Sequence, residues 1–71
     1  MKTYQIYSIV TNHNIYNYFY QKEKNDIYGN NRYRVYIIDI DNMTIYEKIF
    51  KTYENYISDN VKQFIEKNCN Y

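Results

Sequence analysis

The sequence predicts a small α+β fold, an antiparallel β-sheet of three to four strands with one C-terminal amphipathic helix packed on one face. Three observations predict it. Apolar and polar residues alternate through most of the chain, apolar residues recur every three or four positions near its C-terminus, and the abundant Tyr and Ile are typical of strands. The 71 residues are enough for a single domain, 1–71.

The N-terminal part is predicted to supply two strands. Lys2–Val10 alternates between two faces, and the polar segment Thr11–Asn14 is typical of a turn. Ile15–Lys22 alternates again, although the same residues also allow an amphipathic helix. We favour the strand because Tyr, Phe, Asn and Ile are middling or poor helix formers. One face of that strand then carries three tyrosines, Tyr16, Tyr18 and Tyr20.

A loop and a hairpin are predicted next. Glu23–Asn31 is polar, contains the only glycine and is expected to be the most mobile segment. Arg32–Ile40 and Met43–Thr52 are typical of strands, and Asp41 and Asn42 between them favour a two-residue turn.

The register of that hairpin gives it two faces. One carries Ile38, Ile40 and Ile45 with Arg34 opposite Ile49, and we expect it to meet the core. The other is mixed and aromatic, and we expect it to stay uncovered. Its members are Tyr33, Val35, Ile37, Asp39, Thr44, Tyr46, Lys48 and Phe50.

Tyr53–Lys67 is predicted to be the helix, because its apolar residues recur at spacings of three and four. Thr52 can cap its N-terminus, and Ser58 offers a second start if the helix is broken. The tail after Lys67 is expected to fray.

The tyrosines indicate where a binding surface lies. A single helix of about 15 residues cannot cover 12 tyrosines, each of which would bury roughly 150–250 Å². Tyrosine is favoured at protein interfaces, so we predict a partner-binding site on the uncovered sheet face. It consists of Tyr16, Tyr18, Tyr20, Tyr33, Tyr46, Arg32 and Arg34. Replacing Tyr16, Tyr18 and Tyr20 by Ser is expected to abolish binding and spare the fold.

No residue pattern indicates catalysis or a cofactor. His13 lies in a predicted turn and Cys69 in the tail, with nothing to orient either as a nucleophile. Asp39 and Asp41 lack the further oxygen ligands that a cation needs, and no Cys or His spacing fits zinc. We therefore expect a non-enzymatic protein with no metal and no cofactor. A lone Cys and the lack of a signal sequence or membrane span favour the cytoplasm.

The expected function is protein binding. The skew toward residues with AT-rich codons is typical of low-GC bacteria and their phages, whose small products often bind a host protein. The favoured interpretation is a phage or mobile-element inhibitor of a host defence factor (anti-CRISPR type) or a DNA-metabolism factor, in the host cytoplasm.

Two other classes stay open. A single-stranded nucleic-acid binder could stack bases on the tyrosines, but a net charge of +1 argues against it. A structural homo-oligomer, such as a homodimer, could bury the tyrosine face against its own copy.

Overall fold

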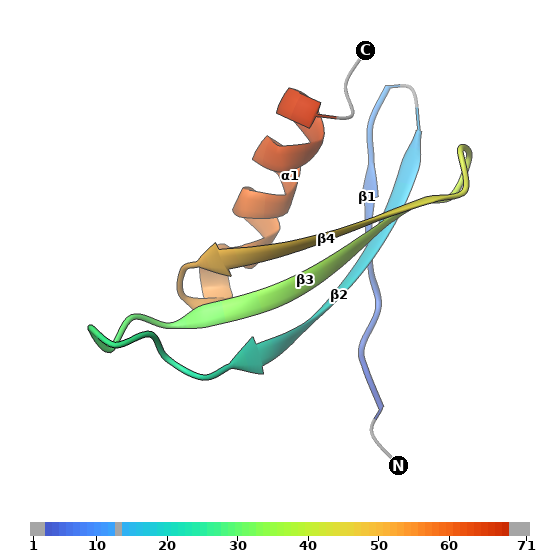
Figure 1. The fold of residues 1–71 in the computed structure, drawn as a ribbon. Helices are drawn as coiled ribbons and strands as arrows, with labels where there is room; N and C mark the ends of the chain where they lie inside the picture. Colours follow the sequence, from blue (N-terminus) through green and yellow to red (C-terminus); the bar gives the residue numbers. More distant parts are fainter. Residues whose placement is uncertain (1–2, 13, 69–71) are drawn as a thin grey trace.

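The computed structural model describes residues 3–12 and 14–68. Four strands form one sheet in the order β1 (Tyr7–Val10), β2 (Ile15–Glu23), β3 (Arg32–Asp39) and β4 (Thr44–Lys51). Every neighbouring pair is antiparallel. A short 3₁₀ helix, η1 (Glu54–Tyr56), leads into the helix α1 (Ile57–Asn68), which lies across one face of the sheet (Figure 1). The predicted α+β fold is confirmed.

Strand β2 settles the alternative between strand and helix for the second segment. It pairs with β1 on one side and with β3 on the other, so the helical interpretation is wrong. Its Tyr18 lies opposite Ile37, and Tyr20 lies opposite Val35. Long β-branched and aromatic residues on neighbouring strands pack well across such pairs, which outweighs any weak helical preference.

The predicted register of the second hairpin is confirmed, but its turn is longer. Ile38 lies opposite Ile45, yet the strands end at Asp39 and Thr44 and leave four residues in the turn. The Asp39 carboxylate accepts hydrogen bonds from the backbone N–H of Asn42 (3.2 Å) and from its side-chain amide (2.8 Å). Met43 takes a positive φ of 54°. Hydrogen bonds to the Asp39 side chain thus close this four-residue turn. In a two-residue turn, Ile40 and Met43 would be paired through their backbones instead.

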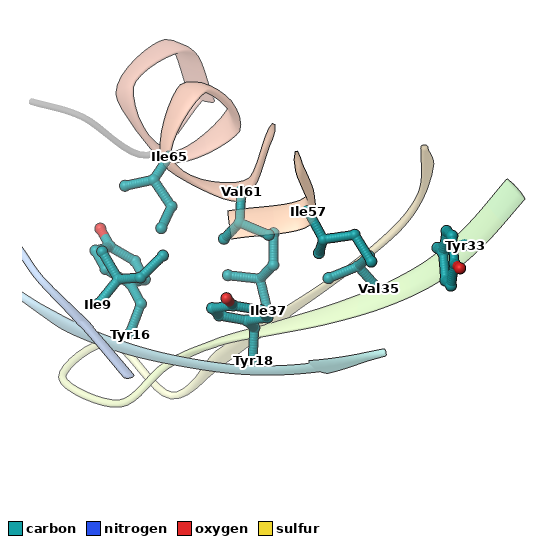
Figure 2. Packing of buried hydrophobic residues seen from close by; sticks show 9 residues of the cluster. All are labelled: Ile9, Tyr16, Tyr18, Tyr33, Val35, Ile37, Ile57, Val61 and Ile65. Carbon is teal, nitrogen blue, oxygen red and sulfur yellow. The ribbon is translucent and has the colours of Figure 1, made fainter. Parts of the chain in front are cut away.

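The helix covers the opposite face of the sheet from the predicted one. Ile57, Val61 and Ile65 point from α1 onto a face that carries Val35 and Ile37 at its centre (Figure 2). Tyr16 and Tyr18 from β2, Tyr33 from β3 and Ile9 from β1 complete the buried cluster. The face with Ile38, Ile45 and Ile49, expected to meet the core, is uncovered instead.

The cost of burying polar groups explains this choice of face. Besides its isoleucines, the uncovered face carries Asn17 and Gln21 on β2 next to Arg34 on β3, and Glu47 on β4. The buried stripe of α1 is apolar and would offer these amides and charges no partner when it takes them out of water, which costs several kcal/mol. On the covered face, Asp39 is buried but accepts hydrogen bonds from the side-chain amides of Asn14 and Asn42, and Lys48 stays exposed. The prediction placed Tyr16, Tyr18 and Tyr20 of β2 on the uncovered face, and the structure places Tyr16 and Tyr18 in the core instead.

The helical segment matches the predicted stripe but begins differently. Ile57, Val61 and Ile65 are buried, as predicted. The first turn is a 3₁₀ helix without a side-chain cap, and Thr52 instead accepts a hydrogen bond from the amide of Asn60 (3.1 Å). Tyr53 and Tyr56 consequently stay exposed. The tail was predicted to fray after Lys67, but Asn68 is the last residue of α1 and its side-chain amide donates to the Phe64 carbonyl (3.1 Å); the rest of the predicted tail, including Cys69, lies outside the described residues.

Candidate interaction surfaces

The tyrosines predicted to bind a partner lie mostly in the core. Tyr16 and Tyr18 are only 1% and 5% exposed, beneath α1, and Tyr33 is 9% exposed at the end of the cluster beyond Val35 (Figure 2). Tyr46 is half-buried and packs edge-on against Phe64 of α1, with ring centroids 5.6 Å apart. The expectation that these tyrosines stay exposed is therefore wrong. The buried ones cannot touch a partner while the helix is packed.

Tyr20 lies at the margin of this core. Its ring stacks on Tyr7 at 5.8 Å and meets Tyr33 edge-on at 5.7 Å. Its hydroxyl donates to the Glu54 carboxylate at 2.9 Å. Burial, with the bonds to Tyr7 and Glu54, raises the pKa of the Tyr20 hydroxyl above its usual range. This side chain ties η1 to the sheet.

Arg34 lies on the uncovered face, in a network of charges. Its guanidinium pairs with the carboxylates of Glu23 (3.3 Å) and Glu47. The hydrogen bond from Arg34 holds the pKa of Glu23 below its usual range, and the two carboxylates raise the pKa of Arg34. Because Arg34 is already paired twice, it has little charge left to offer a nucleic acid. Arg32 is half-buried, and its Nε donates to the carbonyl of Lys24 (2.9 Å).

The connection between β2 and β3, residues 24–31, forms a hydrogen-bonded loop at one end of the sheet (Figure 1). The Asp26 carboxylate accepts bonds from the backbone N–H groups of Tyr28 and Asn30, both 2.9 Å, and from the Asn30 side-chain amide at 3.0 Å. The Gly29 N–H donates to the Asp26 carbonyl at 3.0 Å. Gly29 has φ 83°, a value that favours glycine. We call this segment the Asp26 loop.

The Asp26 loop presents two large apolar side chains to solvent. Ile27 is 90% exposed and Tyr28 is 82% exposed. Both follow directly after the residue whose carboxylate organises the loop. Lys51 of β4 ties it to the sheet through an ion pair with Asp26 at 3.6 Å. A hydrogen-bonded backbone thus carries an apolar tip that lies outside the core.

A shallow hollow adjoins the loop. Gly29, Asn30 and Asn31 form one side of it, and Lys51, Thr52 and Tyr53 form the other. Its volume is about 160 Å³, which is below that of a typical small-molecule site. The hollow therefore fits a contact with a side chain of another protein better than an enclosed ligand.

The Asp26 loop is expected to lose its order only in strong acid. Hydrogen bonds from Asn30 and Tyr28, helped by Lys51, lower the pKa of the Asp26 carboxyl to about 2. An unfolded Asp titrates near ~3.9, so the stabilisation is complete above that pH and is lost as the pH falls toward 2. The amide NMR shifts of Tyr28 and Asn30 should therefore titrate with a midpoint near 2. A midpoint near 4 would show that the carboxylate is not held by the loop.

Other kinds of site find no support in the described chain. Residues 3–12 and 14–68 hold no group of three or more His, Cys, Asp or Glu that could bind a metal ion. Asp39 is buried and bonded to its own turn. The nucleophile candidates His13 and Cys69 lie outside the described residues. None of the described helical residues forms a span long and apolar enough to cross a membrane.

Comparisons with protein families, with curated proteins and with solved structures give no match to this chain. The Asp26 loop escaped prediction because its polarity suggested mobility. The signal that could have revealed it is the spacing of Asp26 and Asn30 around Gly29, since Asp and Asn side chains bond to nearby backbone in turns.

Proposed function

We propose that this protein is a non-enzymatic protein-binding module whose Asp26 loop inserts Ile27 and Tyr28 into an apolar pocket of a partner protein. One observation carries the proposal. A hydrogen-bonded loop holds these two side chains almost fully in water, where they stabilise nothing in the fold. Tyrosine in particular is common among the few residues that contribute most of an interface's binding energy.

Preorganisation of the loop favours tight binding. A loop that is disordered before binding loses conformational freedom when it docks, and that loss weakens affinity. The bonds from Tyr28, Gly29 and Asn30 to Asp26 restrict the backbone beforehand. Tyrosine then adds a large contact area while only two side-chain torsions become fixed. Both features reduce the entropic cost of docking.

The charge near the loop indicates the kind of pocket. Four basic side chains surround the base of the loop, and two carboxylates, those of Glu23 and Asp26, lie among them. The basic residues are Lys22, Lys24, Arg32 and Lys51. Both carboxylates are already paired, with Arg34 and Lys51 respectively. A partner pocket with an apolar floor and an acidic rim complements this end of the molecule. We take the partner to be a host protein, as the composition predicts, and occupation of the pocket would inhibit it.

Capture from a cell lysate tests the proposal. The tagged protein is incubated with nuclease-treated lysate of the cell in which it is naturally made. Ile27→Ser with Tyr28→Ser should reduce capture of the partner by about thirtyfold or more, the effect of losing a hot spot worth at least ~2 kcal/mol. Quantitative mass spectrometry of the eluates measures this ratio.

Two controls make the result specific. Tyr56→Ser removes another exposed tyrosine, one that belongs neither to the Asp26 loop nor to the lining of the adjoining hollow, and should leave capture unchanged. Both variants should keep the wild-type circular dichroism and melting temperature, because exposed substitutions change stability by about 0.5 kcal/mol or less. Undiminished capture by the double variant would refute the proposal. Capture that disappears after nuclease treatment would instead favour the nucleic-acid alternative.

A further inference from the structure

The face of the sheet away from α1 carries an extended apolar surface. We call it the open face. On β2 it consists of Ile15, Asn17, Phe19, Gln21 and Glu23. On β3 it consists of Arg32, Arg34, Tyr36 and Ile38, and on β4 of Ile45, Glu47 and Ile49. Tyr4, Ile6, Ser8 and Val10 complete it on the first strand and the residues before it. Seven aliphatic side chains, counted over the open face and the turn that joins β3 to β4, are 39–89% exposed. They are Ile6, Val10, Ile15, Ile40, Met43, Ile45 and Ile49.

These side chains are graded along the strands. At the end near the two tight turns, Val10 lies opposite Ile15, and the Ile40 N–H donates to the Ile15 carbonyl. In the middle, Phe19 stacks on Tyr36 with ring centroids 4.9 Å apart. At the far end, Glu23 lies opposite Arg32. On β2 and β3 the open face therefore changes from aliphatic through aromatic to charged, while β4 adds Glu47 beside Tyr36 and Ile49 beside Arg34.

We infer that the open face of one chain packs against the open face of a second copy, giving a dimer with the layer order helix, sheet, sheet, helix. The four strands hold 4, 9, 8 and 8 residues, and at about 4.8 Å between strands and about 3.3 Å per residue they cover roughly 460 Å² in projection. Two such faces bury roughly 900 Å², and the side chains of residues 3–6 and 40–43 beside them bring the total near the ~1,000 Å² that a specific interface needs. The dimer also doubles the core of a 71-residue chain that has no disulfide.

A two-fold axis parallel to the strands matches the two faces. It lays β2 of one copy over β3 of the other at the same level along the strands, within the roughly 30° at which packed sheets cross. Ile15 then faces Ile40 of the second copy. Phe19 faces Tyr36 of the second copy, so aromatic rings meet aromatic rings.

The same axis pairs the charged ends with the correct signs. Glu23, which already binds Arg34 of its own chain, faces Arg32 of the second copy, so its carboxylate lies between two guanidinium groups, and by symmetry the second such pair forms as well. The other in-plane axis, across the strands, would lay the aliphatic end over the charged end and leave ions against isoleucines. Charge complementarity therefore selects a second copy in the first arrangement.

Sedimentation velocity over micromolar to submillimolar concentrations tests this dimer. The mass obtained from sedimentation of the wild type should be twice the chain mass of 8.9 kDa. Ile15→Lys places a charge in the centre of the aliphatic end and should raise the dissociation constant by about thirtyfold or more, which gives monomers at the lower concentrations. Ile45→Lys is a second variant with an exposed side chain and should do the same if Ile15→Lys fails to fold.

Ile27→Lys is the matched control. Ile27 is the most exposed of the isoleucines and lies on the Asp26 loop, off the open face. This variant should stay dimeric and yet lose partner capture, so failure of the dimer and failure of the proposed function are distinguishable. A monomeric wild type would overturn the inference. So would a dimer that both open-face variants leave intact, because another surface would then hold it.

Discussion

Replacing Tyr16, Tyr18 and Tyr20 together by serine is expected to unfold the protein. Tyr16 and Tyr18 are almost fully buried, and removal of a buried aromatic ring costs about 3–5 kcal/mol. A chain of 71 residues has a total stability of about 4–11 kcal/mol. The two buried rings alone therefore account for a loss of similar size. Loss of Tyr20 also frees Glu54 and η1 from the sheet.

Far-UV circular dichroism and thermal melting measure this effect. The matched control replaces three exposed tyrosines, Tyr28, Tyr53 and Tyr56, by serine. This variant should melt like the wild type, since none of the three rings packs in the core. If the β2 triple variant kept a cooperative melt at the wild-type temperature, the tyrosines would be surface residues, as their number in the sequence suggested.

Ile37→Ala is expected to cost about 2–5 kcal/mol of unfolding free energy. Ile37 is fully buried between Tyr18 on β2 and Tyr46 on β4, with Val61 of α1 above it (Figure 2). Close packing on all sides prevents the site from collapsing around the smaller side chain, so a cavity remains. The loss should thus lie in the upper part of the usual range for this substitution.

Urea denaturation measures this loss as a lower midpoint at an unchanged slope. The control is Ile27→Ala, which removes the same atoms from a position in water and should change stability by about 0.5 kcal/mol or less. An equally small change for Ile37→Ala would mean that α1 packs on the other face of the sheet.

Much of the fold could be predicted because it depends on local patterns. Alternation identified the strands, although the first begins only at Tyr7 and residues 3–6 of the predicted strand Lys2–Val10 are not part of it. The β-branched runs flanking Asp41 and Asn42 fixed the register of the second hairpin, with Ile38 opposite Ile45. The stripe of Ile57, Val61 and Ile65 identified the helix. These features depend on residues close together in the sequence.

The covered face could not be predicted from one hairpin. Both faces of β3 and β4 carry isoleucine or aromatic residues, so their patterns alone leave the choice open. The deciding groups, Asn17 and Gln21, lie on β2, and they count only once β2 is registered against β3. The predicted binding site is wrong for this reason. Its tyrosines lie on the same sheet face as Val35 and Ile37, and the helix covers that face.

The Asp26 loop was hidden for a different reason. Its order comes from bonds of Asp26 to Tyr28, Gly29 and Asn30, which no periodicity reveals. Exposure of Ile27 also depends on the path of the chain between β2 and β3. Sequence analysis thus predicted a protein-binding surface rich in tyrosine, and the structure moves the proposed contact to a different tyrosine, Tyr28.

Photo-crosslinking from position 28 tests the proposed function most directly. Tyr28 is replaced by the photoreactive analogue benzoylphenylalanine, which keeps an aromatic ring at the tip of the Asp26 loop, and the cells that naturally make the protein are irradiated. The account predicts a covalent adduct with one other protein, and no such adduct when the analogue replaces the exposed Tyr56. No adduct from position 28, together with capture of the same partner through another surface, would contradict it.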